Sequence, residues 1–321
     1  MRESIYTMAE VFWIDSNGMS AENSVSHKLK RLIAGSGAAD GLEEGMRVAM
    51  KISTAEDGYE YGLRPIFIRA VAEEVQKVAE KCPIICDGVK LIDYWGKVKG
   101  NAFQNTSNSK GYTDTTLSGN FLINGGFSGD EGNSYPVKAA DSMLGGVEVG
   151  TAICRTDALL VLSHVTLHPL FGLSGAILNG GFESLICKER VRILEGINPY
   201  TFSGSPPPKE RLERFQRRAI EGLLGVREAM GRRVFYINYL WDVTPEPEYY
   251  PYSNLPVTPN LGFLASLDPV ALDAATYDVL REFTPGQDPM LHHTGVDFSR
   301  VLNQAADFGL GTLDHVVKRS S

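Results

Sequence analysis

Two histidines four residues apart, His164 and His168, lie in the stretch DALLVLSHVTLHPLFGLSGAILNGGFES, residues 157–184. An apolar run precedes them, and a string of glycines follows. An imidazole titrates near neutral pH, so either ring could move a proton to or from a substrate. We expect His168 to be the proton-transferring group and His164 to share the catalytic site. If the strand stops at Ser163 and a helical turn follows, this spacing puts both rings on one face.

The same spacing would suit two metal ligands, but two ligands do not make a metal site. Asp87, Glu148, Cys154 and Asp268 could each supply a third ligand, and the sequence does not show which of them approaches. The simpler interpretation is that one histidine is packed and the other lines a cleft. No metal-ligating residue is therefore assigned, and a bound metal stays an alternative.

Two carboxylates share the stretch SLDPVALDAA. Asp268 stands before a proline, where it can cap a helix, and we favour this role over a catalytic one. Asp273 falls inside the helix between apolar positions, so its carboxylate must point outward or be paired. Pairing across a cleft would make Asp273 a third candidate catalytic residue. The string GLSGAILNGG, with Gly175 and Asn179, could bind an anion through its backbone N–H groups, but it matches neither GxGxxG nor the Walker pattern.

Four cysteines, at positions 82, 86, 154 and 187, are too few for a disulfide scaffold in a chain of 321 residues. No run resembles C-x2-C-x2-C, so we do not expect an iron–sulfur cluster held by this chain alone. The cofactor is otherwise left open.

The elements that must position these residues can be predicted from hydrophobic periodicity. Four helices are predicted in SVSHKLKRLIAGSG, RPIFIRAVAEEVQKVAEKC, KERLERFQRRAIEGLLGVREAM and DPVALDAATYDVLREF. Five buried strands are predicted in RVAMKI, PIICD, ALLVLS, RVFYINYL and GFLAS. Their alternation predicts one α/β domain over residues 1–321, with a mostly parallel sheet flanked by helices. The polar, glycine-rich stretch around residues 100–150 is poorly periodic, and we expect an insertion or a lid there.

In sheets of this kind, ligands bind beyond the carboxyl ends of the strands. The polar segments after the five predicted strands should therefore converge on one edge. The residues that we expect to bind substrate there are Asp87, Tyr94, Gly175, Asn179, Trp241 and Asp268.

The composition narrows the class of partner. The formal net charge is −8 and no basic stripe is present, which disfavours nucleic-acid binding. No run of about 18 apolar residues predicts a membrane span, and the first residues do not resemble a signal peptide. We expect a cytoplasmic protein with a small-molecule substrate, and a homodimer is possible.

Four blocks together resemble the domain-of-unknown-function 362 family, whose members are often called iron–sulfur-centre proteins. They are VAMKISTAEDGYEYGLRPIFIRAVAEEV, CDGVKLIDYWG, the histidine and glycine block quoted above, and PNLGFLASLDPVALDAATYDVL. The resemblance implies the α/β scaffold and a ligand cleft, and it brings no single established reaction.

The chain departs from the family pattern at informative places. Thr166, Leu167 and Leu178 stand where relatives commonly have lysine and glycine, and the family's cysteine-rich segments have no counterpart here. We therefore expect a divergent member without the cluster, and a cleft less cationic and more apolar than in its relatives.

The function expected is that of a small-molecule enzyme, in specialised metabolism, that uses acid–base chemistry for isomerisation, cyclisation or elimination. One alternative is an oxidoreductase that uses a diffusible flavin-type cofactor or a bound metal. Another is a non-catalytic ligand-binding protein.

Overall fold

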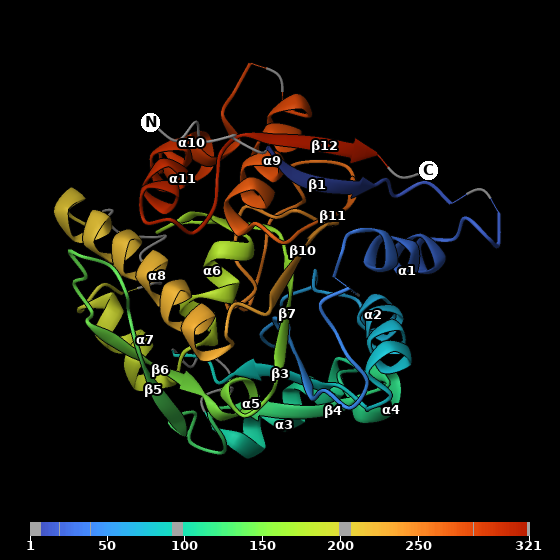
Figure 1. Ribbon diagram of the computed structural model, residues 1–321. Coiled ribbons are helices and arrows are strands. Elements are labelled where there is room, and N and C mark those ends of the chain that lie inside the picture. Colours follow the sequence, from blue (N-terminus) through green and yellow to red (C-terminus); the bar gives the residue numbers. More distant parts are fainter. Residues whose placement is uncertain are drawn as a thin grey trace, which may run out of the picture.

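An eight-stranded sheet runs through the centre of the computed structural model, which describes residues 8–18, 20–38, 40–91, 99–198, 207–284 and 286–319 (Figure 1). The strand order is β12-β1-β11-β10-β7-β2-β3-β4. The bounds are β1 (Ala9–Ile14), β2 (Val48–Lys51), β3 (Ile84–Gly88), β4 (Asn120–Asn124), β7 (Ala158–His164), β10 (Val234–Leu240), β11 (Gly262–Ser266) and β12 (His315–Arg319). Strand β11 pairs antiparallel with β1 and β10, and the other pairs in this sheet are parallel.

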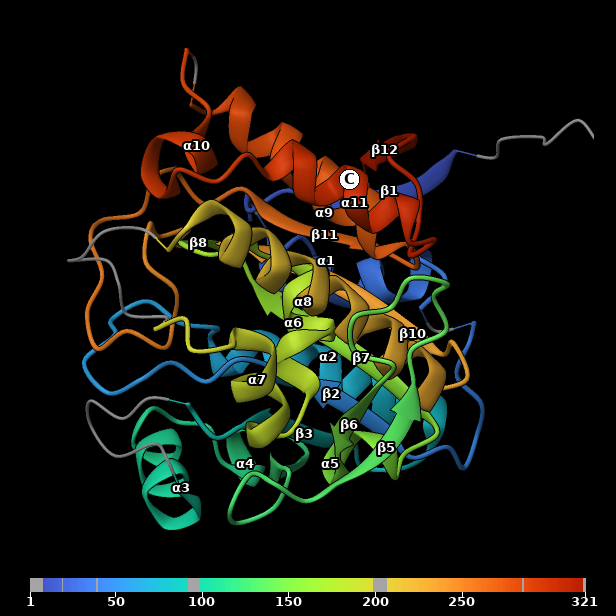
Figure 2. The same cartoon turned by 90° about the vertical axis from the view of Figure 1, so that its left-hand side faces the viewer.

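Helices cover both faces of the sheet. Figure 1 shows α1 (Val25–Gly35) and α2 (Pro65–Ala79) on one side and α6 (Ala176–Gly180) with α8 (Lys209–Ala229) on the other. Figure 2 looks onto the second side, where α8 and α7 (Cys187–Leu194) lie in front of the strands. The remaining helices are α3 (Gly100–Ser109), α4 (Asp114–Leu117), α5 (Thr151–Cys154), α9 (Pro269–Glu282), α10 (Pro289–Thr294), α11 (Phe298–Asp307) and the 3-10 turn η1 (Phe182–Ser184).

The four predicted helices and five predicted strands are confirmed. Helix α2 begins at Pro65, whose fixed φ suits a first helical position, and it buries Val71 and Val75 against the sheet. Helix α9 begins after Asp268, whose Oδ1 accepts the N–H groups of Val270 and Ala271 at 2.9 Å each. These local signals are strong enough to define both helix starts.

Three expectations need correction. Because β11 runs against β10, its end at Ser266 lies at the amino-terminal edge of β10, so Asp268 does not join the convergent edge. Strand β7 continues through His164 and is followed by β8 (Thr166–His168), so no helical turn joins the two histidines. Residues 100–150 are more than an insertion, because they supply edge strand β4 as well as the hairpin of β5 (Gly132–Pro136) and β6 (Gly146–Gly150).

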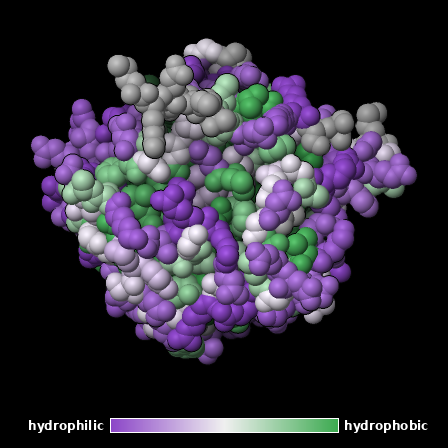
Figure 3. Space-filling model, in the orientation of Figure 1, coloured by the Kyte–Doolittle hydropathy of each residue, from purple (hydrophilic) through white to green (hydrophobic). Residues whose placement is uncertain are grey.

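The surface in the orientation of Figure 1 is mainly hydrophilic, with separate hydrophobic patches between the polar side chains (Figure 3). In the described part of the chain, no helix is both long enough and apolar enough to cross a bilayer.

Candidate functional site

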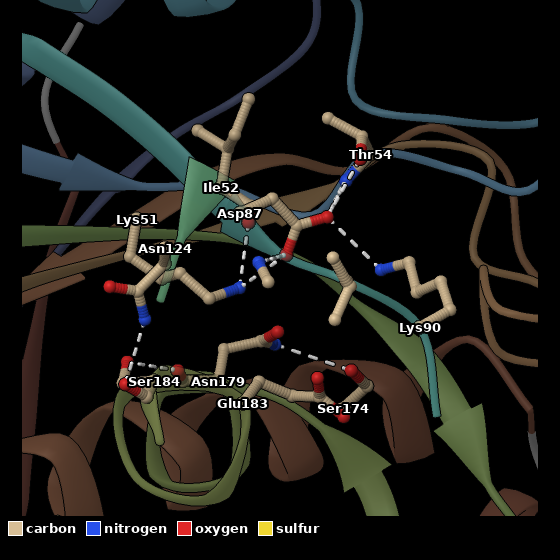
Figure 4. A network of polar contacts seen from close by, with 12 residues as sticks. Lys51, Ile52, Thr54, Asp87, Lys90, Asn124, Ser174, Asn179, Glu183 and Ser184 are labelled. Carbon is tan, nitrogen blue, oxygen red and sulfur yellow. Dashed lines mark hydrogen bonds and ion pairs between the residues drawn. The ribbon is translucent and has the colours of Figure 1, made fainter. Parts of the chain in front are cut away.

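The buried carboxylate of Asp87 accepts hydrogen bonds from groups at the carboxyl ends of β2 and β3 (Figure 4). Its Oδ1 accepts the Lys51 ammonium at 3.0 Å and the Gly88 N–H at 2.8 Å. Its Oδ2 accepts the Thr54 N–H at 2.8 Å, the Thr54 hydroxyl at 2.7 Å and the Lys90 ammonium at 3.0 Å. Asp87 is 1% exposed, so this carboxylate organises the edge of the sheet and is shielded from solvent.

Lys51 and Lys90 bring two positive charges to this one carboxylate. Both lysines are buried. For Lys90, burial lowers the pKa, but the charges of Asp87, Glu183 and Glu248 outweigh it and leave the pKa above its ordinary value. Lys90 is therefore a fixed ammonium group and a poor proton acceptor.

Beside this cluster lies a narrow pocket. Its wall combines polar and apolar side chains: Lys90, Leu91, His168, Leu170, Phe182, Glu183, Arg190, Leu194, Phe215 and Tyr249. An apolar cavity with a few converging polar groups is typical of a small-molecule site.

Arg190 of α7 contributes a second cation to the pocket. Its Nη1 lies 3.2 Å from Glu183 Oε2, and its Nη2 donates to the Val89 carbonyl. The side chain is 2% exposed, and its Nε–H has no hydrogen-bond partner among the described residues. Gly88 leaves room for the guanidinium, because a Cβ there would lie 3.1 Å from Nη2.

His168 lines the pocket as a neutral ring. Its Nδ1 accepts the N–H groups of Leu170 at 3.2 Å and Phe171 at 3.1 Å, so the ring proton belongs on Nε2. Nε2 lies 3.3 Å from the Tyr249 hydroxyl. Burial lowers the pKa of His168 to about 3. The geometry thus favours a hydrogen-bond donor at this position and does not favour the proton shuttle that we expected.

His164 has the opposite pattern. Its Nδ1 lies 2.9 Å from Glu248 Oε1, and its Nε2 lies 2.8 Å from the Trp241 carbonyl oxygen. Both partners are acceptors, so both ring nitrogens must carry protons, and no lone pair is left for a metal ion. Burial lowers the pKa of His164, but the Glu248 charge and the two hydrogen bonds raise it above the ordinary value overall.

Asp273 holds the beginning of α6. Its carboxylate accepts the N–H groups of Ala176 at 2.7 Å and Ile177 at 2.9 Å, and the Asn238 amide at 2.8 Å. Burial raises the pKa of Asp273 to about 6, although these hydrogen bonds oppose the shift. A Cβ on Gly175 would lie 2.3 Å from Asp273 Oδ1, so this glycine allows the contact. Asp273 and Gly175 thus have a structural role, which is to anchor the beginning of α6.

The chain was compared with protein-family models, with curated proteins and with solved structures. A family model described as "Domain of unknown function (DUF362)" matches residues 48–278, which is more than half of the chain. The chain belongs to the DUF362 family. The resemblance found in the sequence is therefore confirmed, and the matched range includes every candidate residue discussed above.

No curated protein matches the DUF362 chain. Among solved structures, it is similar to the lactate racemase apoprotein from Thermoanaerobacterium thermosaccharolyticum, with 12% sequence identity and a TM-score of 0.45. The similarity covers 72% of this chain and 50% of that one, so the DUF362 chain corresponds to half the length of the racemase.

Of the other residues expected to bind substrate in the DUF362 chain, Asn179 lies near the Asp87 cluster and Trp241 lies elsewhere. Asn179 donates from Nδ2 to the Ser174 hydroxyl at 3.2 Å and to the Gly175 carbonyl at 3.0 Å, and Figure 4 shows it facing the Asp87 cluster. Trp241 lies in an aromatic group with Phe67, at a centroid distance of 5.4 Å, among residues that pack on the α2 side. Tyr94 lies outside the described residues.

Asp268 sits apart from these residues. Besides capping α9, its Oδ2 accepts the Thr312 N–H at 2.9 Å. The structure therefore supports the capping role for Asp268 and does not bring it to the pocket.

Sequence reasoning missed Lys51, Lys90, Glu183 and Arg190. A signal existed for the two lysines, since Lys51 ends an apolar strand and Lys90 follows Asp87 by three residues. The expectation that the cleft is less cationic and more apolar than in the relatives stays a prediction. Leu167 and Leu178 are indeed buried, but Lys90 and Arg190 supply positive charge at the pocket from other elements.

The described residues contain no group of three or more His, Cys, Asp or Glu side chains that could hold a metal ion. The cysteines are free: Cys82 is exposed, Cys86 is buried, and Cys154 and Cys187 are half-buried. Burial raises the pKa of the Cys86 thiol to about 12, so this thiol is a poor nucleophile.

Proposed function

We propose that this DUF362 chain is an enzyme that performs acid–base chemistry on a small molecule in the pocket beside Asp87. One observation carries the proposal: the pocket places a carboxylate, Glu183, in the same wall as the neutral N–H donor of His168. A base and an oxyanion-stabilising donor are the two groups that proton abstraction next to a carbonyl requires.

Each group has a distinct role in this proposal. Glu183 removes a proton from a substrate carbon, and the electron pair moves onto the neighbouring carbonyl oxygen. His168 donates its Nε2–H to that oxygen as negative charge develops there. Return of the proton to another face or another carbon gives isomerisation, and loss of a leaving group gives elimination.

The surroundings support these roles. The Arg190 guanidinium pairs with Glu183 at 3.2 Å and so holds this carboxylate in the pocket wall. His168 stays neutral because Nδ1 is occupied by two backbone N–H groups. Phe182, Leu170 and Phe215 give the same wall an apolar surface, which favours strong interactions between the polar groups there.

Hydrogen–deuterium exchange tests the proposal and does not require the product to be identified first. Small carbonyl and hydroxy compounds that bind the purified chain, as measured by calorimetry, are incubated with it in D2O and followed by proton NMR. We expect loss of one carbon-bound proton signal from a bound compound, and Glu183→Gln to slow this loss by about 100-fold or more.

Glu189→Gln is the matched control, because Glu189 lies six residues further on and pairs with Arg192 at 2.6 Å, outside the pocket wall. This variant should exchange at the wild-type rate. Compounds that bind and are released with every proton retained would instead identify a ligand-binding protein.

A further inference from the structure

We infer that the ligand of this pocket is an organic monocarboxylate with an apolar body, whose carboxylate lies between Lys90 and Arg190. The inference rests on the proposed function and deepens it by naming the substrate class.

The charges of the pocket leave one positive charge in excess. Lys90 and Arg190 face Glu183 in the wall, and His168 is neutral. Behind the wall, Lys51 and Asp87 form an ion pair at 3.0 Å, which adds no net charge. His164 and Glu248 form another such pair at 2.9 Å. An uncompensated charge away from water is costly, so a single negative charge on a ligand is favoured here.

Arg190 and Lys90 also have N–H groups that form no hydrogen bond with the described residues. Arg190 is 2% exposed and its Nε–H is without a partner in that part of the chain. The Lys90 ammonium has three protons, and Asp87 is its hydrogen-bond partner among the described residues. Free donors on buried cations match the two oxygens of a carboxylate.

The same balance disfavours a phosphate dianion. Its second negative charge would exceed the single positive charge available and would lie in the same wall as Glu183.

The apolar side chains of the pocket wall are the reason for inferring a ligand with an apolar body. Phe182 and Phe215 pack edge to face with ring centroids 5.4 Å apart, and Leu170 and Leu194 line the same space. These side chains have no polar atoms, so a ligand that fills the space gains by burying hydrocarbon against them.

Calorimetry on the full chain with four matched probes tests the inference: 3-phenylpropanoate, its neutral amide, acetate and phenyl phosphate. We expect 3-phenylpropanoate to bind about tenfold or more tightly than each of the other three. Lys90→Gln should remove most of this preference over the amide while leaving amide binding unchanged. Because the comparison of acid with amide uses the wild-type chain, it does not depend on how well any variant folds.

Lys188→Gln is the control for a general loss of positive charge, because Lys188 is on α7 two residues from Arg190 but is 55% exposed and pairs with Glu148. It should bind all four probes as the wild type does. Equal binding of acid and amide, tighter binding of phenyl phosphate, or no binding of 3-phenylpropanoate would each overturn the inference. A carboxylate that binds without deuterium exchange would contradict the proposed function alone, and exchange on neutral compounds without charge preference would contradict this inference alone.

Discussion

At the scale of single residues, the two histidines of one short stretch have opposite hydrogen-bonding patterns. Two backbone N–H donors face His168 Nδ1, whereas two acceptors, Glu248 Oε1 and the Trp241 carbonyl, face His164. The surroundings therefore hold one ring neutral and the other protonated. Residue type alone predicts neither state, because the partners of His164 come from 77 and 84 residues further along the chain.

The lowered pKa of His168 predicts an acid-sensitive contribution to stability. Below pH 6.5 the unfolded chain takes up a proton that the folded ring, with a pKa of about 3, does not accept. Stability must therefore fall as the pH drops from 6.5 towards 3. Between pH 7 and 4.5, wild-type protein should lose about 2–3 kcal/mol more free energy of unfolding than His168→Gln does. Urea denaturation at the two pH values measures this difference, and equal losses would contradict the neutral state of His168.

Gly175 gives a second test at this scale. An alanine Cβ there would lie 2.3 Å from Asp273 Oδ1 and would displace the carboxylate that anchors α6. We expect Gly175→Ala to lower the free energy of unfolding by about 1–3 kcal/mol. Gly35→Ala is the control, because nothing lies within 4 Å of its added Cβ and alanine favours the helix that Gly35 ends. Equal free energies of unfolding for the two variants in urea would show that the close contact between Gly175 and Asp273 does not contribute to stability.

At the scale of elements, the segment between β10 and β11 is tied to the end of β7. The Leu167 N–H donates to the Thr244 carbonyl at 2.9 Å, and the Glu248 carboxylate lies 2.9 Å from His164 Nδ1. This segment carries Tyr249, the residue next to Glu248, to the pocket wall beside His168. The buried His164–Glu248 pair thus positions one wall of the pocket.

The pH dependence of this attachment has the opposite sign to that of His168. The folded pKa of His164 is raised, so its stabilising contribution is fully present below the unfolded value near 6.5 and is lost as the pH rises through the folded value. Glu248 and Asp242 are the charged groups that act on the ring. At pH 6, His164→Gln should cost about 3–5 kcal/mol, because it leaves Glu248 buried without its ionic partner. The difference from wild type, measured in urea from pH 6 to pH 9.5, should shrink as the pH rises, and a constant difference would contradict an ionised His164.

The helices and strands that could be predicted have a regular hydrophobic pattern or a residue that marks where they begin. Buried parallel strands are continuous apolar runs, and prolines 65 and 269 mark where two helices begin. The direction of β11 was not predictable, because GFLAS reads the same whether its neighbours run with it or against it. Strand β4, with the sequence NFLIN, was missed because its polar ends hide a short apolar centre.

At the scale of the whole molecule, the pocket joins parts of the chain that no local pattern connects. Lys90 follows β3, Glu183 and Arg190 come from η1 and α7, and Tyr249 comes from the segment after β10. These segments meet at one edge of the sheet, which is where the rule that ligands bind beyond the carboxyl ends of parallel strands led us to expect a site. It could not name Arg190, since a basic residue on a short polar helix looks like a surface residue until the fold buries it.

Two hydrophobic cores lie on opposite faces of the one sheet, and their arrangement predicts how the molecule unfolds. Leu223 of α8 belongs to one core and Ile68 of α2 to the other, and both are fully buried. Neighbouring strands contribute to both cores, so loss of either should release the shared sheet. We expect Leu223→Ala and Ile68→Ala each to lower the free energy of unfolding by about 2–5 kcal/mol.

In each variant, tryptophan fluorescence and far-ultraviolet circular dichroism should report the same urea midpoint, because Trp13 packs in one core and Trp241 against the other. A variant in which one signal changes at lower urea concentration while the other stays native would show two independently folding units. The single domain over residues 1–321 would then be wrong. Coincident transitions would mean that both cores, and the pocket built on their common edge, are stabilised together.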